Sequence, residues 1–139
     1  MFHSIDLRAY CQATEEEEHV ERAIRALSPT GTIETQKAEG HNGNPILLLR
    51  CRLEDRGEIA TFWMRLKEAG TMGEILEDLE ARIDEDAVLH LRFDKQKAFA
   101  GTVELARHDD VIAVKAKVAA NPAKKSTAVR VAREFLERV

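Results

Sequence analysis

The sequence predicts an α+β fold, a two-layer sandwich in which a largely antiparallel sheet of about six strands carries helices on one face. Three observations lead to this prediction. Several segments alternate apolar and polar residues with the period of a half-buried strand. Others repeat apolar residues at i, i+3, i+4 and i+7, as amphipathic helices do. Short connectors join several of the strands, which favours antiparallel pairing.

The size and composition of the chain point to one domain over residues 1–139, because domains of roughly 100–150 residues bury a core without disulfides. Apolar residues make up 44% of the chain and charged residues 33%, which excludes disordered and low-complexity classes. No apolar run has membrane-spanning length, and residues 1–6 do not resemble a signal peptide. Cys11 and Cys51 form neither a CxxC pair nor a disulfide framework. We therefore expect a cytoplasmic protein.

The first expected strand covers residues 2–11. One of its faces carries Ile5, Leu7, Ala9 and Cys11, and the other carries Ser4, Asp6, Arg8 and Tyr10. A helix over 15–27 follows, because Thr14 and Glu17 have the spacing of a capping box and Pro29 ends the apolar stripe.

Two strands, 32–38 and 46–53, come next and are joined by a turn-rich segment that contains an Asn-Gly pair. Asp55 is placed to cap a helix over 56–69, which carries Phe62 and Trp63 on its apolar stripe. A further helix is expected over 72–83.

Three more strands are expected over 89–93, 99–105 and 112–118, since each alternates apolar and polar residues. The short segments 94–97 and 107–110 connect them as hairpins. A last helix runs over 126–138.

Charge is distributed unevenly along the chain. Residues 1–86 contain 10 basic and 19 acidic side chains, a net charge of −9, and residues 87–139 contain 11 basic and 6 acidic ones, a net charge of +5. The total of −4 argues against a general polyanion binder, but the basic C-terminal part leaves a local polyanion-binding surface open.

The face of the sheet without helices is expected to gather cations. By the alternation, it includes Arg8, Arg50, Arg52, His90, Arg92, Lys115 and Lys117. Two interpretations stay open: these side chains keep an exposed face soluble and unpaired, or they bind a polyanion whose phosphates offset their repulsion. Tyr10 is the one aromatic residue expected there, so for a nucleic acid, recognition of the backbone or shape is favoured over base stacking.

Signals for catalysis are weak. The five histidines show no metal-ligand spacing, and the glycines form neither a P-loop nor a dinucleotide fingerprint. The segment from His108 to Asp110 fits a polar turn better than a metal site. We expect no enzymatic activity, no cofactor and no metal.

Three segments together resemble a known family. They are Glu39-Gly-His-Asn-Gly-Asn-Pro-Ile46, Arg92-Phe-Asp-Lys-Gln-Lys-Ala-Phe-Ala-Gly101, and Asp109-Asp-Val-Ile-Ala-Val-Lys-Ala-Lys-Val-Ala-Ala-Asn-Pro-Ala-Lys124. In this order and spacing they resemble the archaeal RNA-binding proteins that are predicted exosome subunits, over nearly the whole chain. The fold of that family is similar to that of the ribosomal protein that binds 5S RNA.

The resemblance implies an RNA-binding protein of an archaeal cytoplasm, with RNA and subunits of an RNA-processing complex as partners. A second copy of the chain is a further expected partner, through the open sheet face. It also implies a role in RNA processing or degradation. The expected RNA contacts are Arg92, Lys95, Lys97, Lys115, Lys117 and Lys124. Secondary candidates are Arg8, Arg50, Arg52, His41, Asn42 and Asn44. The alternative is a protein-interaction or dimerisation module that uses Ile46 and Leu48 on the open sheet face.

Overall fold

The alternating segments form one antiparallel sheet. The computed structural model describes residues 1–39, 43 and 45–139, and within these residues the sheet has five strands in the order β2-β3-β1-β5-β4. The strands are β1 (Phe2–Cys11), β2 (Ile33–Glu39), β3 (Pro45–Leu53), β4 (Val88–Asp94) and β5 (Val111–Val118). Every neighbouring pair is antiparallel, as predicted, although only β2 and β3 are joined by a short connector.

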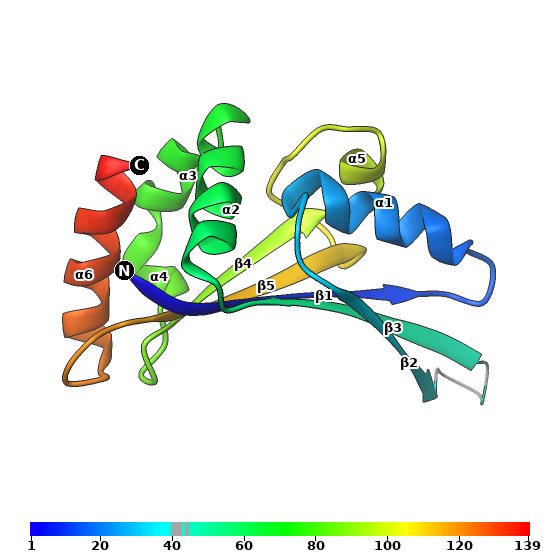
Figure 1. Ribbon diagram of the computed structural model, residues 1–139, viewed down its shortest axis with the longest axis horizontal. Coiled ribbons are helices and arrows are strands. Elements are labelled where there is room, and N and C mark those ends of the chain that lie inside the picture. The colour runs from blue at the N-terminus through cyan, green and yellow to red at the C-terminus, as the bar shows by residue number, and fades with distance from the viewer. Residues whose placement is uncertain (40–42, 44) are drawn as a thin grey trace.

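The helices cover one side of this sheet and leave the other side open (Figure 1). They are α1 (Glu17–Leu27), α2 (Arg56–Glu68), α3 (Met72–Glu77), α4 (Leu79–Arg82), α5 (Lys95–Phe99) and α6 (Lys125–Arg138). The β2–β3 end of the sheet curves away from the helices in this view. The predicted α+β architecture with helices on one face is therefore confirmed.

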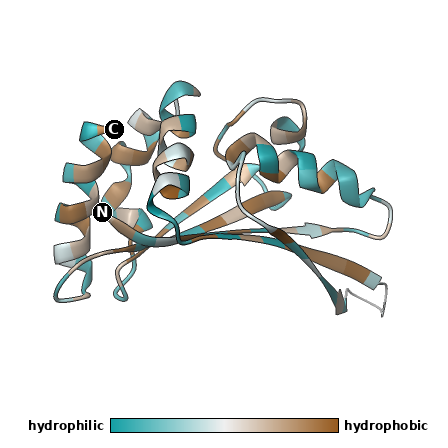
Figure 2. Cartoon of the chain, viewed as in Figure 1, coloured by the Kyte–Doolittle hydropathy of each residue, from teal (hydrophilic) through white to brown (hydrophobic). Residues whose placement is uncertain are grey.

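A continuous apolar core fills the space between the two layers. Phe62 and Trp63 of α2 are fully buried, and so is Phe93 of β4. Figure 2 shows long hydrophobic stretches in the strands, whereas hydrophobic and hydrophilic residues alternate along α1. Because the alternating residues of each strand point to opposite faces, one face of every strand serves this core and the other remains open.

The predicted strand over 99–105 is wrong, which leaves five strands in the described sheet instead of about six. Asp94 accepts a hydrogen bond from the Lys97 backbone N–H at 2.9 Å, so the chain starts the short helix α5 where a hairpin turn was expected. Gly101 then turns the backbone at a φ of 94°, and Leu105 makes only a single antiparallel bridge to Phe93. The apolar residues of this segment, among them Val103 and Leu105, are buried although the segment forms no strand.

Two predicted helices also begin or end differently. The capping box of Thr14 and Glu17 does not form: helix α1 begins at Glu17, after Glu16, and the Glu17 carboxylate accepts a hydrogen bond from the Thr35 hydroxyl at 2.7 Å. The helix expected over 72–83 is interrupted at Asp78, which separates α3 from α4. Asp55 caps α2 as predicted, accepting from the Glu58 N–H at 3.1 Å. Over the part of the chain that the structure describes, no helix has the length and apolarity needed to cross a bilayer.

Candidate functional site

The strand register brings the predicted open-face arginines together. Arg8 of β1 lies directly opposite Arg50 of β3, and Asp6 lies opposite Arg52 in the same ladder. On the other side of β1, Asp6 lies opposite Lys115 of β5. Opposed residues in an antiparallel pair share one face of the sheet, so these five side chains form one cluster.

Asp6 stands at the centre of this cluster. Its side chain is only 9% exposed, and Arg50 donates to both of its oxygens, from Nε to Oδ1 at 3.3 Å and from Nη2 to Oδ2 at 2.7 Å. Arg8 Nε and Arg52 Nη1 each lie 3.7 Å from an Asp6 oxygen. The hydrogen bond to Asp6 and the negative charge of Asp6 raise the pKa of Arg50. One carboxylate therefore faces three guanidinium groups.

The remaining open-face cations lie on β4 and β5. Arg92 is exposed and pairs with Asp109 at 3.1 Å, and Lys117 donates to the Asp86 backbone carbonyl. Lys115 is exposed, and no residue that the structure describes forms a hydrogen bond or ion pair with its ammonium group. We use the term cationic face for six residues of the open side: Arg8, Arg50, Arg52, Arg92, Lys115 and Lys117.

His90 lies in the same row as Lys115, its ladder partner. Its Nε2 is 2.7 Å from Asp84 Oδ2. Burial raises the pKa of the Asp84 carboxyl, but the hydrogen bonds from His90, Val88 and Asp86 outweigh it and lower that pKa. His90 is thus tied to a loop acid at the edge of the cationic face.

Lys95 does not belong to this surface. Its side chain is only 2% exposed, and its ammonium group reaches Glu15 at 2.8 Å, Asp110 at 2.9 Å and the Tyr10 carbonyl at 2.9 Å. Burial lowers its pKa, but the hydrogen bonds to Glu15 and Asp110 outweigh burial and raise it. The buried ammonium group is unavailable to a phosphate, so Lys95 leaves the set of candidate RNA contacts.

Lys97 and Lys124 are exposed but stand apart from the arginines. Lys97 belongs to α5, which packs beside α1 on the helical side, and it pairs with Glu104 at 3.0 Å. Lys124 precedes α6 and lines a shallow hollow with Glu80 and Glu85, whose charges offset its own. The secondary candidates His41, Asn42 and Asn44 lie outside the described residues.

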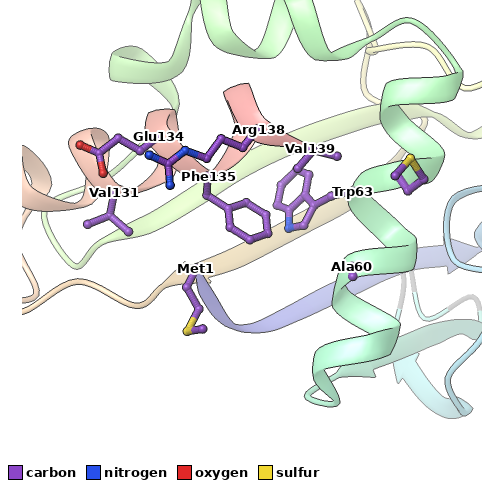
Figure 3. A pocket seen from close by; sticks show the side chains of 9 residues that line it. Met1, Ala60, Trp63, Val131, Glu134, Phe135, Arg138 and Val139 are labelled. Atoms are coloured by element: carbon purple, nitrogen blue, oxygen red, sulfur yellow. The ribbon is translucent and has the colours of Figure 1, made fainter.

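Two hollows lie near opposite faces of the molecule. One, of about 390 Å³, is lined on the open side by Arg50, Arg52 and three neighbours, Thr32, Glu34 and Glu54. The other, of about 530 Å³, lies between α2, α6 and the start of β1. Figure 3 shows the Phe135 ring of the second hollow between Met1 and Trp63. Polar and charged groups thus line the hollow at the sheet, and mostly apolar groups line the one at the helices.

The arrangement offers charge and hydrogen-bond donors and little catalytic chemistry. Among the described residues, no group of three or more His, Cys, Asp or Glu side chains could hold a metal ion. Guanidinium groups with N–H donors that remain exposed are suited to phosphate, which accepts paired N–H donors. Asp6 was not predicted as a site residue, although the alternation of residues 2–11 already placed it beside Arg8.

Comparisons with known proteins agree with this chemistry. A family model described as RNA binding matches residues 4–118. The chain is 35% identical to the RNA-binding protein PAB1135 of Pyrococcus abyssi, over 97% of this chain and 94% of that protein. Protein AF2318 from Archaeglobus fulgidus has a similar structure, with a TM-score of 0.87, 40% identity and coverage of 97% of this chain and 99% of the other. Mth689 from Methanothermobacter thermautotrophicus has a TM-score of 0.85, 42% identity and 98% coverage of both chains.

Proposed function

The chain belongs to an archaeal family of RNA-binding proteins, and from this premise we propose that its cationic face binds the phosphate backbone of RNA. We propose that the protein has no catalytic activity. The observation that carries the proposal is the convergence of three guanidinium groups on Asp6, together with an exposed Lys115. Arg52 also pairs with Glu54 at 3.3 Å, and Glu34 lies opposite Arg50. Each phosphate bound there releases counterions and offsets repulsion between the cations.

The scarcity of aromatic rings on the open side favours contacts with the backbone over stacked bases. Tyr10 is half exposed, but Phe62, Trp63 and Phe93 are fully buried in the core. Proteins that stack bases expose several rings for this purpose. Phosphate contacts carry little sequence information, so binding is expected to be weakly selective for sequence.

The proposed setting is the cytoplasm of an archaeon, as an accessory of RNA processing or degradation. The support for this is the resemblance of three segments of the chain to proteins that are predicted exosome subunits. Similarity to the fold of the ribosomal protein that binds 5S RNA remains a prediction from the same resemblance. Subunits of a processing complex and a second copy of the chain are proposed protein partners.

A salt titration with two matched double variants tests the RNA-binding proposal. Lys115→Ala/Lys117→Ala removes two cations from the cationic face, and Lys67→Ala/Lys97→Ala removes two from the helical side. For every phosphate that a variant no longer neutralises, the slope of log affinity against log salt falls by about 0.7–0.9. We expect the slope of the first variant to fall by two such increments and that of the second to match the wild type.

The absence of salt-dependent RNA binding by the wild-type protein would overturn the proposal. A protein-interaction module would then be the better interpretation of the open face. Tyr10 lies opposite Leu48 at one end of that face, and Ile46 is half-buried beside them. An apolar interface at these residues would respond little to salt.

A further inference from the structure

We propose that Asp6 is a specificity-determining residue, which fixes the orientation of Arg50 and attracts Arg8 and Arg52, and so makes the cationic face prefer double-helical RNA to single-stranded RNA. This inference rests on the proposed RNA-binding function and adds a substrate class and a positioning residue to it. Asp6 itself contacts arginines and is not proposed to touch RNA.

The contacts of Asp6 restrain Arg50 most strongly. Arg50 uses two different nitrogens on the two Asp6 oxygens, which fixes the plane of its guanidinium group as well as its position. Asp6 is almost buried between β3 and β5, so the carboxylate is itself held by the sheet. A side chain locked in this way presents its remaining N–H groups in a constant direction.

The arginines would repel one another without this carboxylate. Arg8 and Arg50 are direct ladder partners, and like charges at such positions destabilise a sheet. Arg8 and Arg52 each lie 3.7 Å from Asp6, too far for a hydrogen bond but close enough for attraction, and Arg52 lies nearer to Glu54, at 3.3 Å. Asp6 therefore gathers three cations while cancelling the charge of only one.

A donor of this cluster is left without an acceptor in the free protein. Arg8 Nε is buried and has no hydrogen-bond partner among the described residues. A buried donor without a partner is costly, and such a group is expected to gain from a ligand that supplies an acceptor. A phosphate oxygen that displaced Arg8 slightly toward the solvent would supply one.

Hydrogen-bond donors held in fixed positions favour a ligand whose phosphates are also held at fixed positions. The backbone of an RNA double helix holds its phosphates at regular spacing, whereas a single strand adapts to almost any arrangement of cations. Preorganised groups lose little conformational entropy when they bind a rigid partner. Mobile cations would bind both RNAs by charge alone, so a preference for the duplex depends on the restraint from Asp6.

The test compares Asp6→Asn with Glu34→Gln, which changes the charge by the same amount. Glu34 lies opposite Arg50 in the β2–β3 ladder, but no hydrogen bond joins their side chains. Affinities for an RNA duplex and for a single strand of equal length are measured at one salt concentration. In Asp6→Asn we expect the duplex preference to fall by about tenfold, the worth of one charge-assisted hydrogen bond. In Glu34→Gln both affinities rise and the preference is kept.

Arg50→Lys provides a second variant if Asp6→Asn does not fold. It keeps the net charge of the wild type but cannot bind Asp6 through two nitrogens. We expect it to lose duplex preference at an unchanged salt slope. Circular dichroism and thermal melting establish that each variant is folded.

The outcomes separate this inference from the function on which it rests. If wild-type protein binds RNA but shows no duplex preference, or if Asp6→Asn and Arg50→Lys keep it, the inference is overturned and RNA binding stands. An equal loss of preference in Glu34→Gln also overturns it, because charge alone would then be the cause. A wild-type protein that binds no RNA removes the proposed function and the inference together.

Discussion

Lys95 is a buried cation whose ammonium group joins distant parts of the chain. It binds Glu15 before α1, Asp110 before β5 and the Tyr10 carbonyl at the end of β1. Gln96 adds further hydrogen bonds to the same two carboxylates, at 3.4 Å to Glu15 and 2.9 Å to Asp110. The Lys95 side chain thus connects the end of β1, the segment before α1 and the segment before β5.

We expect Lys95→Met to lower the free energy of unfolding by about 1–3 kcal/mol, since it leaves the partly exposed carboxylates of Glu15 and Asp110 without the hydrogen bonds from Lys95. Lys97→Met is the matched control. The Lys97–Glu104 pair is exposed, so its removal should cost less than about 1 kcal/mol. Urea unfolding of both variants measures the difference, and equal costs would contradict the assigned role of Lys95.

The same cluster predicts how stability depends on pH. Burial opposes ionisation of Glu15 and Asp110, but the hydrogen bonds from Lys95 outweigh it and lower the pKa of both carboxyls from their ordinary values of 4.5 and 3.8. A lowered pKa in the folded state contributes stability that is complete above the unfolded value. This contribution is lost as the pH falls through the folded values.

Unfolding measured between neutral and acidic pH checks this linkage. The stability difference between wild type and Lys95→Met should be largest near neutral pH and shrink below pH about 4, where the unfolded carboxyls bind protons. The raised pKa of Lys95 extends the full contribution up to its ordinary value of 10.5. A difference that stays constant down to acidic pH would be inconsistent with the lowered pKa values.

At the scale of elements, helix α2 depends on its aromatic stripe. The Trp63 ring lies 4.7 Å from the Phe2 ring of β1 and 5.0 Å from the Phe62 ring, measured between centroids. The contact with Phe2 joins α2 to the start of β1. The apolar stripe that predicted this helix is the same surface that packs it.

Trp63→Ala is expected to lower the free energy of unfolding by about 3–5 kcal/mol, because it leaves a large cavity between α2 and the sheet. The neighbouring Met64 is 45% exposed and serves as the control. Met64→Ala should cost less than about 1 kcal/mol, as substitutions away from the core do. Thermal or denaturant unfolding of the two variants gives the comparison.

For the whole molecule, the acidic start of α1 and the cationic face lie on opposite sides of the sheet. The acidic run from Glu15 to Glu18 lies at the start of α1 on the helical side, whereas the cationic face lies on the opposite side of the sheet. The excess of acids in residues 1–86 is therefore compatible with an RNA surface on the same molecule. RNA would approach from the open side, away from these carboxylates.

Neutralising acids of the helical side should leave RNA affinity nearly unchanged at physiological salt. Glu16→Gln/Glu18→Gln is expected to change it by less than about twofold, since exposed charges are screened beyond roughly 8 Å at 0.15 M salt. Glu34→Gln, beside Arg50, should have the larger effect although it removes only one negative charge. Equilibrium binding of labelled RNA measures both, and a larger effect of the double variant would place the RNA on the helical side.

The sequence alone determined which side chains share a face of each strand and which helices pack on the sheet. These properties follow from local periodicity, two residues in a strand and 3.6 in a helix, and do not depend on distant parts of the chain. The prediction of Arg8, Arg50, Arg52, Arg92, Lys115 and Lys117 on the open side was confirmed for this reason. The burial of Trp63 was predictable in the same way.

Only the tertiary structure decided which of these residues meet and which lysines reach the surface. The pairing of Arg8 with Arg50 is set by the β1–β3 register, and Asp6 becomes a centre of three arginines only when two strands far apart in sequence align. Lys95 and Lys97 are two residues apart in one short helix, yet one is buried by Glu15 and Asp110 and the other is exposed. Contacts of this kind are non-local, and the spacing of residues along the chain does not encode them.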